Sequence, residues 1–219
     1  MMNLRRDLMT LAGGRWEDGL RIGNASMRLR LLESDWKSLR ISFADYLAAQ
    51  REVNAAHFSP WPHQAWARMF HHAKVFVVCM RRFARLLEAA KSKKHEYPPE
   101  VGDAIDLTWR KTKGFFEKYR EARDAIEHID GEVNGYNRCF LNLWGNQLEV
   151  VDGRRADISQ AALDTVEKAW AGIIAAIMRP VEARVRCALM QILLRMLDAR
   201  LQQLNGRDAA PNVDMEPPR

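Results

Sequence analysis

The sequence predicts an all-α protein: an up-and-down bundle of four long helices, with a small β-hairpin inserted before the last helix. Three observations predict this class. Long stretches carry apolar residues at three- and four-residue steps, which is the spacing of one helix face. Proline and glycine gather in short clusters between these stretches. One segment near residues 139–151 changes to the alternating pattern of strands.

The first long helix is expected over residues 25–56, where neither glycine nor proline occurs. Before it, residues 1–23 contain several glycines and have room for one short helix. Asn24 is a suitable N-cap, because its side chain can accept a bond from a free backbone N–H. The expected buried stripe of this helix comprises Leu29, Leu32, Trp36, Leu39, Phe43 and Leu47.

Proline clusters delimit the next two helices. Ser59 and Pro60 suit an N-cap and a first helical turn, so the second helix is expected over Trp61 to Lys94. Its last turn is basic and a pair of prolines follows, which is typical of a helix end. The third helix is expected from about Pro99 to Ile129, with a buried stripe made of Val101, Ile105, Trp109, Phe116, Tyr119, Ala122, Ile126 and Ile129.

The hairpin and the last helix complete the expected domain, which covers residues 24–205. Gly145 and Asn146 form a two-residue turn signal between alternating segments, which predicts the hairpin at about residues 139–151. Ser159 is expected to cap a helix from Gln160 to Leu204, with a kink at Pro180. Residues 206–219 have little apolar surface to bury and are expected to be disordered.

Composition narrows the class of partner. The chain has 219 residues, of which 47% are hydrophobic and 28% charged, and this suits one soluble domain with a sizeable core. A net charge of +6 favours a nucleic acid or another anionic partner, although many basic proteins bind neither. The longest apolar run, Ala169 to Met178, is about half the length of a membrane span. No signal peptide opens the chain, so we expect a cytoplasmic protein without membrane association.

The three cysteines Cys79, Cys139 and Cys187 are an odd number at wide spacing. They form no C-x-x-C pair and no zinc pattern, so reduced thiols are expected. We expect no metal and no other cofactor.

The candidate site is the segment "RDAIEH" near the end of the third helix. Each helical residue turns by about 100°, so Asp124 and His128 form an i, i+4 pair and Arg123 flanks them. A histidine titrates near neutral pH and can exchange a proton, while a guanidinium can hold a phosphate and offset its growing charge. RNA cleavage through the 2′-hydroxyl needs these two functions. The residues therefore point to phosphate chemistry.

This segment resembles the motif of HEPN domains, which are small all-α proteins. Their motif has an arginine, then Asn, Asp or His, then a histidine four to six residues beyond the arginine. The resemblance implies a metal-independent endoribonuclease, with Arg123, Asp124 and His128 as catalytic residues and with two motifs meeting across a homodimer. It also implies a role as a toxin of a toxin–antitoxin or antiviral defence system. The chain departs from the family in its greater length and its added hairpin.

Four further residues are candidates for substrate binding. Arg120 and Glu127 lie beside the motif. Arg81 and Arg85 stand at i, i+4 in the basic stretch "RRFARLLEAAKSKK" of the second helix and could hold a nucleic-acid backbone. The same stretch is also compatible with a solvated helix face.

Two other classes of function fit the same sequence. One is a non-catalytic, HEPN-type helical binding module that pairs with a protein partner, such as an antitoxin or a nucleotidyltransferase. The other is a helical scaffold without a nucleic-acid role. The direction of the His128 side chain distinguishes an enzyme from a scaffold. A cleft shared with Arg123 favours an enzyme, and packing under the hairpin favours a scaffold.

Overall fold

The computed structural model describes residues 3–12, 19–55, 63–131, 142–144, 146–150 and 154–207. For residues 63, 121, 124–131, 142, 144, 150, 154 and 198–207 this description covers the backbone and not the side chains. The helices are α1 (Leu4–Leu11), α2 (Gly19–Ala55), α3 (His63–Ser92), α4 (Pro99–Gly131) and α5 (Gln160–Arg207), with a 3-10 turn η2 at Lys94–Glu96. The strands are β1 (Asn142–Trp144), β2 (Gln147–Val150) and β3 (Arg154–Asp157). The predicted all-α class is confirmed.

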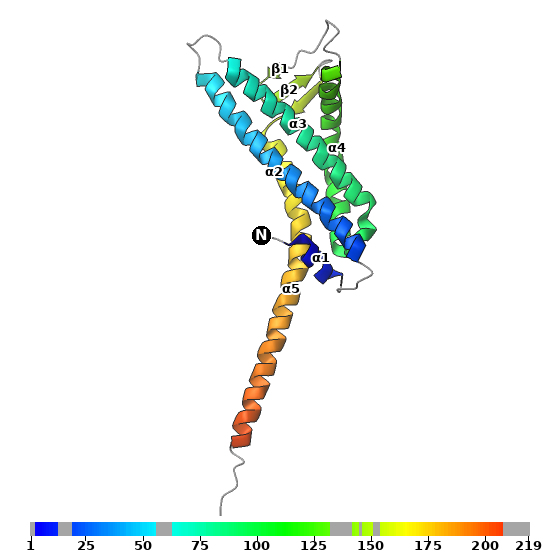
Figure 1. Ribbon diagram of the computed structural model, residues 1–219, viewed down its shortest axis with the longest axis vertical. Coiled ribbons are helices and arrows are strands. Elements are labelled where there is room, and N and C mark those ends of the chain that lie inside the picture. Colours follow the sequence, from blue (N-terminus) through cyan, green and yellow to red (C-terminus); the bar gives the residue numbers. More distant parts are fainter. Residues whose placement is uncertain are drawn as a thin grey trace, which may run out of the picture. The chain divides into compact units, whose positions relative to one another are not determined.

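The chain forms two compact units, Met1–Met178 and Arg179–Arg219. In the first unit, α1 packs on α2, α2 on α3, and α3 on α4, so neighbours in the chain are neighbours in space. Figure 1 shows α3 and α4 close together where η2 joins them and farther apart toward the end of α4. The second unit is the C-terminal part of α5 and the residues that follow it.

The core follows the predicted apolar stripes. The rings of Phe43 and Phe76 lie 5.9 Å apart between α2 and α3, and those of Phe83 and Phe116 lie 6.0 Å apart between α3 and α4. All six predicted stripe residues of α4 up to Ala122 are buried. Large apolar side chains that fill one continuous interior account for most of the stability of such a unit.

A short antiparallel sheet covers part of α4. Its strand order is β1-β2-β3, and Trp144 pairs with Gln147, so two residues separate these strands as the turn signal predicts. The third strand was not predicted. It pairs with β2, and its Ala156 is fully buried. Both β2 and β3 contact α4.

Several predicted helix boundaries differ from the structure. The second helix begins and ends two residues inside the predicted range, while α2 begins at Gly19, so that Asn24 lies inside the helix rather than at its cap. Helix α5 continues to Arg207, past the predicted stop at Asn205. Ser159 does cap α5, since its Oγ accepts a bond from the Ala162 N–H at 3.2 Å. Ser59, Pro60 and the tail beyond 207 lie outside the described residues.

The start of α4 depends on a close backbone approach at Gly102. A Cβ atom there would stand 2.8 Å from the carbonyl oxygen of Lys94 in η2. Real Cβ atoms do not come this close to a backbone oxygen, so only glycine fits without a shift. Gly114, farther along the same helix, has no atom within 4 Å of such a Cβ.

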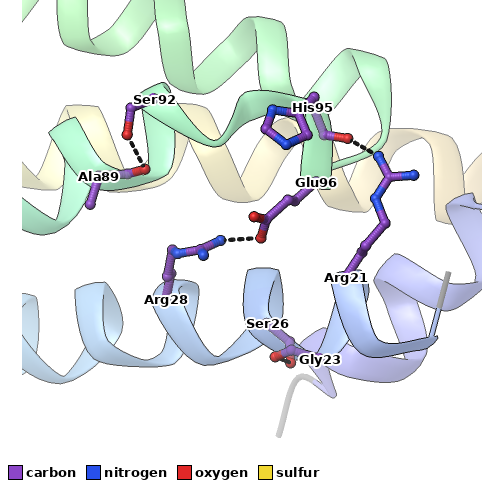
Figure 2. Close-up of polar contacts among 8 residues, drawn as sticks. All are labelled: Arg21, Gly23, Ser26, Arg28, Ala89, Ser92, His95 and Glu96. Atoms are coloured by element: carbon purple, nitrogen blue, oxygen red, sulfur yellow. Dashed lines mark hydrogen bonds and ion pairs between the residues drawn. The ribbon is translucent and has the colours of Figure 1, made fainter.

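Polar contacts hold the start of α2 against η2 (Figure 2). The guanidinium of Arg28 donates to the Glu96 carboxylate at 2.5 Å, and Arg21 donates to the backbone carbonyl of His95. The Arg28 bond lowers the pKa of the Glu96 carboxyl. Both side chains of the ion pair are largely shielded from water, at 22% and 14% exposure, so salt screens the pair less than a surface pair.

Candidate functional site

The motif lies in the last turns of α4, as predicted. Arg123 is half-buried and is engaged in an interaction with its surroundings. Asp124, Glu127 and His128 are part of the same uninterrupted helix, but their side chains lie outside the described ones. The direction of His128, which distinguishes an enzyme from a scaffold, is therefore not among the described features.

Helix geometry places the motif residues on different sides of α4. Arg123 follows Phe116 by seven residues, so it lies within about 20° of that buried ring around the axis. This position explains why Arg123 is half-buried. Position 128 lies about 140° from Arg123, and the exposed Arg120 lies between the two, about 60° from Arg123 and about 80° from position 128. One copy of α4 thus directs the arginine and the histidine positions to different sides.

The sheet is fixed to α4 one turn before the motif. The phenol of Tyr119, which is 1% exposed, donates a hydrogen bond to the backbone carbonyl of Asp157 in β3 at 2.6 Å. Burial, together with the nearby Asp157 carboxylate, raises the pKa of Tyr119 far above its ordinary value. The side chain of Asp157 accepts a bond from the Ser159 hydroxyl at 2.8 Å. Tyr119 thereby joins the motif helix, the sheet and the start of α5.

The candidate arginines of α3 do not join the motif within one copy. The contact between Phe83 and Phe116 sets the register of the antiparallel helices, so Arg85 stands level with residue 114. Residue 114 precedes His128 by 14 residues, which is about 21 Å along the helix. Arg85 is exposed, whereas Arg81 is half-buried and engaged in an interaction of its own.

Arg82, which lies between these two residues, has a structural role that the sequence did not indicate. Its Nη2 lies 3.2 Å from Oδ1 of Asp35, a carboxylate that is 1% exposed. Burial raises the pKa of Asp35, and the Arg82 charge opposes that rise. The buried thiol of Cys79 is close to the same carboxylate, and its pKa is raised by burial. An exposed arginine of the basic stretch therefore pairs with a buried carboxylate of α2.

An open groove lies between α4 and the first part of α5. Its volume is about 410 Å³, and Leu107, Ala169 and Gly172 form part of its apolar lining. Lys111 and Lys168 face it from opposite helices, together with three threonines. This groove could not be predicted from the sequence, because only packing brings the two helices together. Its lysines are exposed, which is typical of a solvated rim.

No protein-family model, no curated protein and no solved structure matches the chain. Among the residues that the structure describes, no group of three or more His, Cys, Asp or Glu side chains is placed to hold a metal ion. Within the same residues, no helix combines the length and the apolar character that crossing a membrane requires.

Proposed function

We propose that the chain is an HEPN-like endoribonuclease that cleaves RNA without a metal ion and acts as a homodimer, as toxins of toxin–antitoxin and defence systems do. The observation that carries the proposal is the placement of "RDAIEH" on one uninterrupted helix, with Arg123 half-buried beside the core. A half-buried arginine is held in place, so its planar guanidinium can bind a phosphate with little loss of side-chain entropy.

The reaction needs a base and an acid. The base removes the proton of the 2′-hydroxyl, whose oxygen attacks the phosphorus. The bond from phosphorus to the 5′-oxygen breaks, and the acid gives that oxygen a proton. The products are a 2′,3′-cyclic phosphate and a free 5′-hydroxyl. Two imidazoles perform these steps at neutral pH, and a dimer supplies two copies of His128.

The geometry of α4 favours a site shared by two copies. Within one copy, Arg123 and position 128 lie about 140° apart around the helix, so they do not converge on one phosphate. A two-fold pair of helices brings the arginine of one copy to the histidine of the other. Asp124 then orients the histidine through a hydrogen bond, and the exposed Arg120 extends the contact to the next phosphate.

The test is cleavage of a fluorescein-labelled single-stranded RNA at micromolar enzyme. His128→Ala should lower the rate by roughly 10²- to 10⁴-fold, the usual effect of losing a proton-transfer group. His71→Ala is the matched control, because His71 is an exposed histidine of α3 and should leave the rate unchanged. Arg123→Lys keeps the charge but loses bidentate binding and should also be slow.

The substrate and the products give independent checks. Cleavage should continue in EDTA, and a DNA of the same sequence should be inert because it lacks the 2′-hydroxyl. If wild type and His128→Ala cleave equally, or if neither cleaves, the ribonuclease proposal is wrong. A protein partner captured by both chains alike would then favour the non-catalytic binding module.

A further inference from the structure

The C-terminal part of α5 carries a large set of exposed apolar side chains. Eight of them are between 51% and 65% exposed: Val185, Leu189, Met190, Ile192, Leu193, Leu194, Met196 and Leu197. Soluble monomers rarely expose so many apolar residues in one stretch. Together they present on the order of 800 Å², which is about what one partner contributes to an interface of standard size.

The spacing along this segment is that of a coiled-coil seam. Between Ala183 and Leu204 a repeat of seven residues has an apolar residue at each of its two core positions. The first core position is occupied by Cys187, Leu194 and Leu201, and the second by Ala183, Met190, Leu197 and Leu204. Three consecutive heptads without a polar core residue are typical of a helix that packs along another helix.

A second apolar face lies on the opposite side of the same segment. It comprises Val185, Leu189, Ile192 and Met196, and charged residues such as Arg184 and Arg195 lie between the two faces. A helix that lies flat on a membrane has one apolar face and one polar face. Apolar residues on both sides instead indicate a helix that packs against protein. Residues 208–219 contain only Val213 and Met215 as large apolar residues, which is too few to cover either face.

We infer that a second copy of this chain covers the segment, with the seam from Ala183 to Leu204 of one copy packed along the same seam of the other. A continuous heptad pattern is complementary to itself, because each core residue fits between core residues of an identical helix. Three of the eight exposed side chains, Met190, Leu194 and Leu197, lie in the middle of this seam, and a two-fold pair buries the same patch from both chains. This inference does not rest on RNA cleavage.

The first experiment measures mass in solution with the full-length chain. Sedimentation at 10 to 50 µM should give twice the chain mass of 25.3 kDa for wild type. Leu194→Glu places a charge in the middle of the seam and should give a single-chain mass. Arg195→Glu is the matched control: it is the next residue, lies outside the seam, changes the charge by more, and should remain dimeric.

All seven tryptophans precede residue 179, so their fluorescence reports on the first unit and shows whether it stays folded in each variant. A wild type of single-chain mass at 50 µM overturns the inference, whether or not it binds anionic vesicles. Equal masses for Leu194→Glu and Arg195→Glu overturn it as well.

Cysteine cross-linking tests the seam by a separate route. In a parallel pair, Cys187 of one copy faces Cys187 of the other, within the Cα separation that a disulfide allows. In an antiparallel pair, Cys187 faces Leu197 of the second copy. Both tests use a chain that carries Cys139→Ser. If the pair is parallel, mild oxidation of this chain should give a covalent dimer through Cys187. If the pair is antiparallel, the covalent dimer should form once Leu197→Cys is added. If neither of these two chains forms a covalent dimer, the seam is contradicted. It is also contradicted if a chain that lacks Cys187 and carries Arg195→Cys, outside the seam, forms as much covalent dimer.

Discussion

The hydrogen bond from Tyr119 to β3 predicts a specific loss of stability. In Tyr119→Phe the ring still fills its buried site, but the carbonyl of Asp157 loses its 2.6 Å partner. A buried hydrogen bond contributes about 0.5–1.5 kcal/mol, and an acceptor left without a partner costs about 1–3 kcal/mol. The site is near the edge of the sheet, where water can partly replace the phenol, so we expect a loss of about 1–2 kcal/mol at pH 7.

The same residue predicts how that loss depends on pH. The pKa of Tyr119 is raised in the folded protein, and in the unfolded chain it is about 10. A raised pKa of this kind contributes stability below pH 10, which is lost as the pH rises and the unfolded chain releases the proton. At pH 11, which is one unit above the unfolded-state pKa of 10, the wild-type protein has lost about 1.4 kcal/mol of stability in this way. Phenylalanine has no proton to release, so the difference between the two proteins should nearly vanish at pH 11.

Urea unfolding followed by far-UV circular dichroism measures both effects. The free energies of wild type and Tyr119→Phe are compared at pH 7, 9 and 11, and Phe115→Leu serves as a ring-contact control without a phenol. Phe115 lies beside Tyr119, with ring centres 5.3 Å apart, and its pH profile should follow wild type. A gap at pH 7 below about 0.3 kcal/mol, or a gap of constant size up to pH 11, would refute the role of this bond.

Three further predictions concern positions away from the motif. Gly114→Ala should raise the unfolding free energy by about 0.5–1 kcal/mol, whereas Gly102→Ala should lower it because its Cβ meets a backbone oxygen. If urea unfolding shows that both substitutions change this free energy in the same direction, the close approach at Gly102 is contradicted. Arg28→Gln should lower the unfolding free energy by about 1–2 kcal/mol at pH 7. Because the pKa of Glu96 is lowered in the folded protein, the contribution of Glu96 to stability is present above about pH 4.5 and is lost as the pH falls through the folded pKa. The effect of Arg28→Gln should therefore become smaller at low pH. Asp35 has a raised pKa, so its ionisation opposes folding: wild type should gain stability relative to Asp35→Asn between pH 7 and pH 4, and a flat difference would exclude this effect.

The sequence predicted the long helices because their apolar stripes are uninterrupted and their ends carry capping or proline signals. It missed the start of α2, where Gly19 and Gly23 look like helix breakers. The structure shows nothing within 4 Å of a Cβ at either glycine, and the burial of Ile22 and Ala25 keeps this turn helical. Tertiary packing here outweighs a cost of about 1 kcal/mol for each glycine.

Strand β3 shows a different limit. Its sequence "RRAD" has no alternating apolar pattern, and Ala156 is its only buried residue among those whose burial is described. Backbone pairing with β2 and the bond from Tyr119 hold it in place, and neither can be deduced from local spacing. The hairpin turn was predictable because its two turn residues are adjacent in the chain.

For the candidate site, the sequence predicted that the motif lies at the end of α4, since position in a helix follows from spacing. It did not predict the half-burial of Arg123, which depends on how α4 packs. The bond between Tyr119 and Asp157 joins residues 38 positions apart, and the pair of Asp35 and Arg82 joins two helices. Long-range pairs of this kind require the folded arrangement.

The order of packing has a consequence for folding kinetics. Most contacts in the first unit join elements that are consecutive in the chain, which keeps the mean sequence separation small and favours rapid folding. The stacked rings of Trp36 and Trp170, 6.2 Å apart, join α2 to α5 across most of the unit. Such a contact closes a long loop and should form after the folding transition state. Trp170→Phe should then speed unfolding in stopped-flow urea jumps while the refolding rate stays nearly constant, and the opposite pattern would place this contact in the folding nucleus.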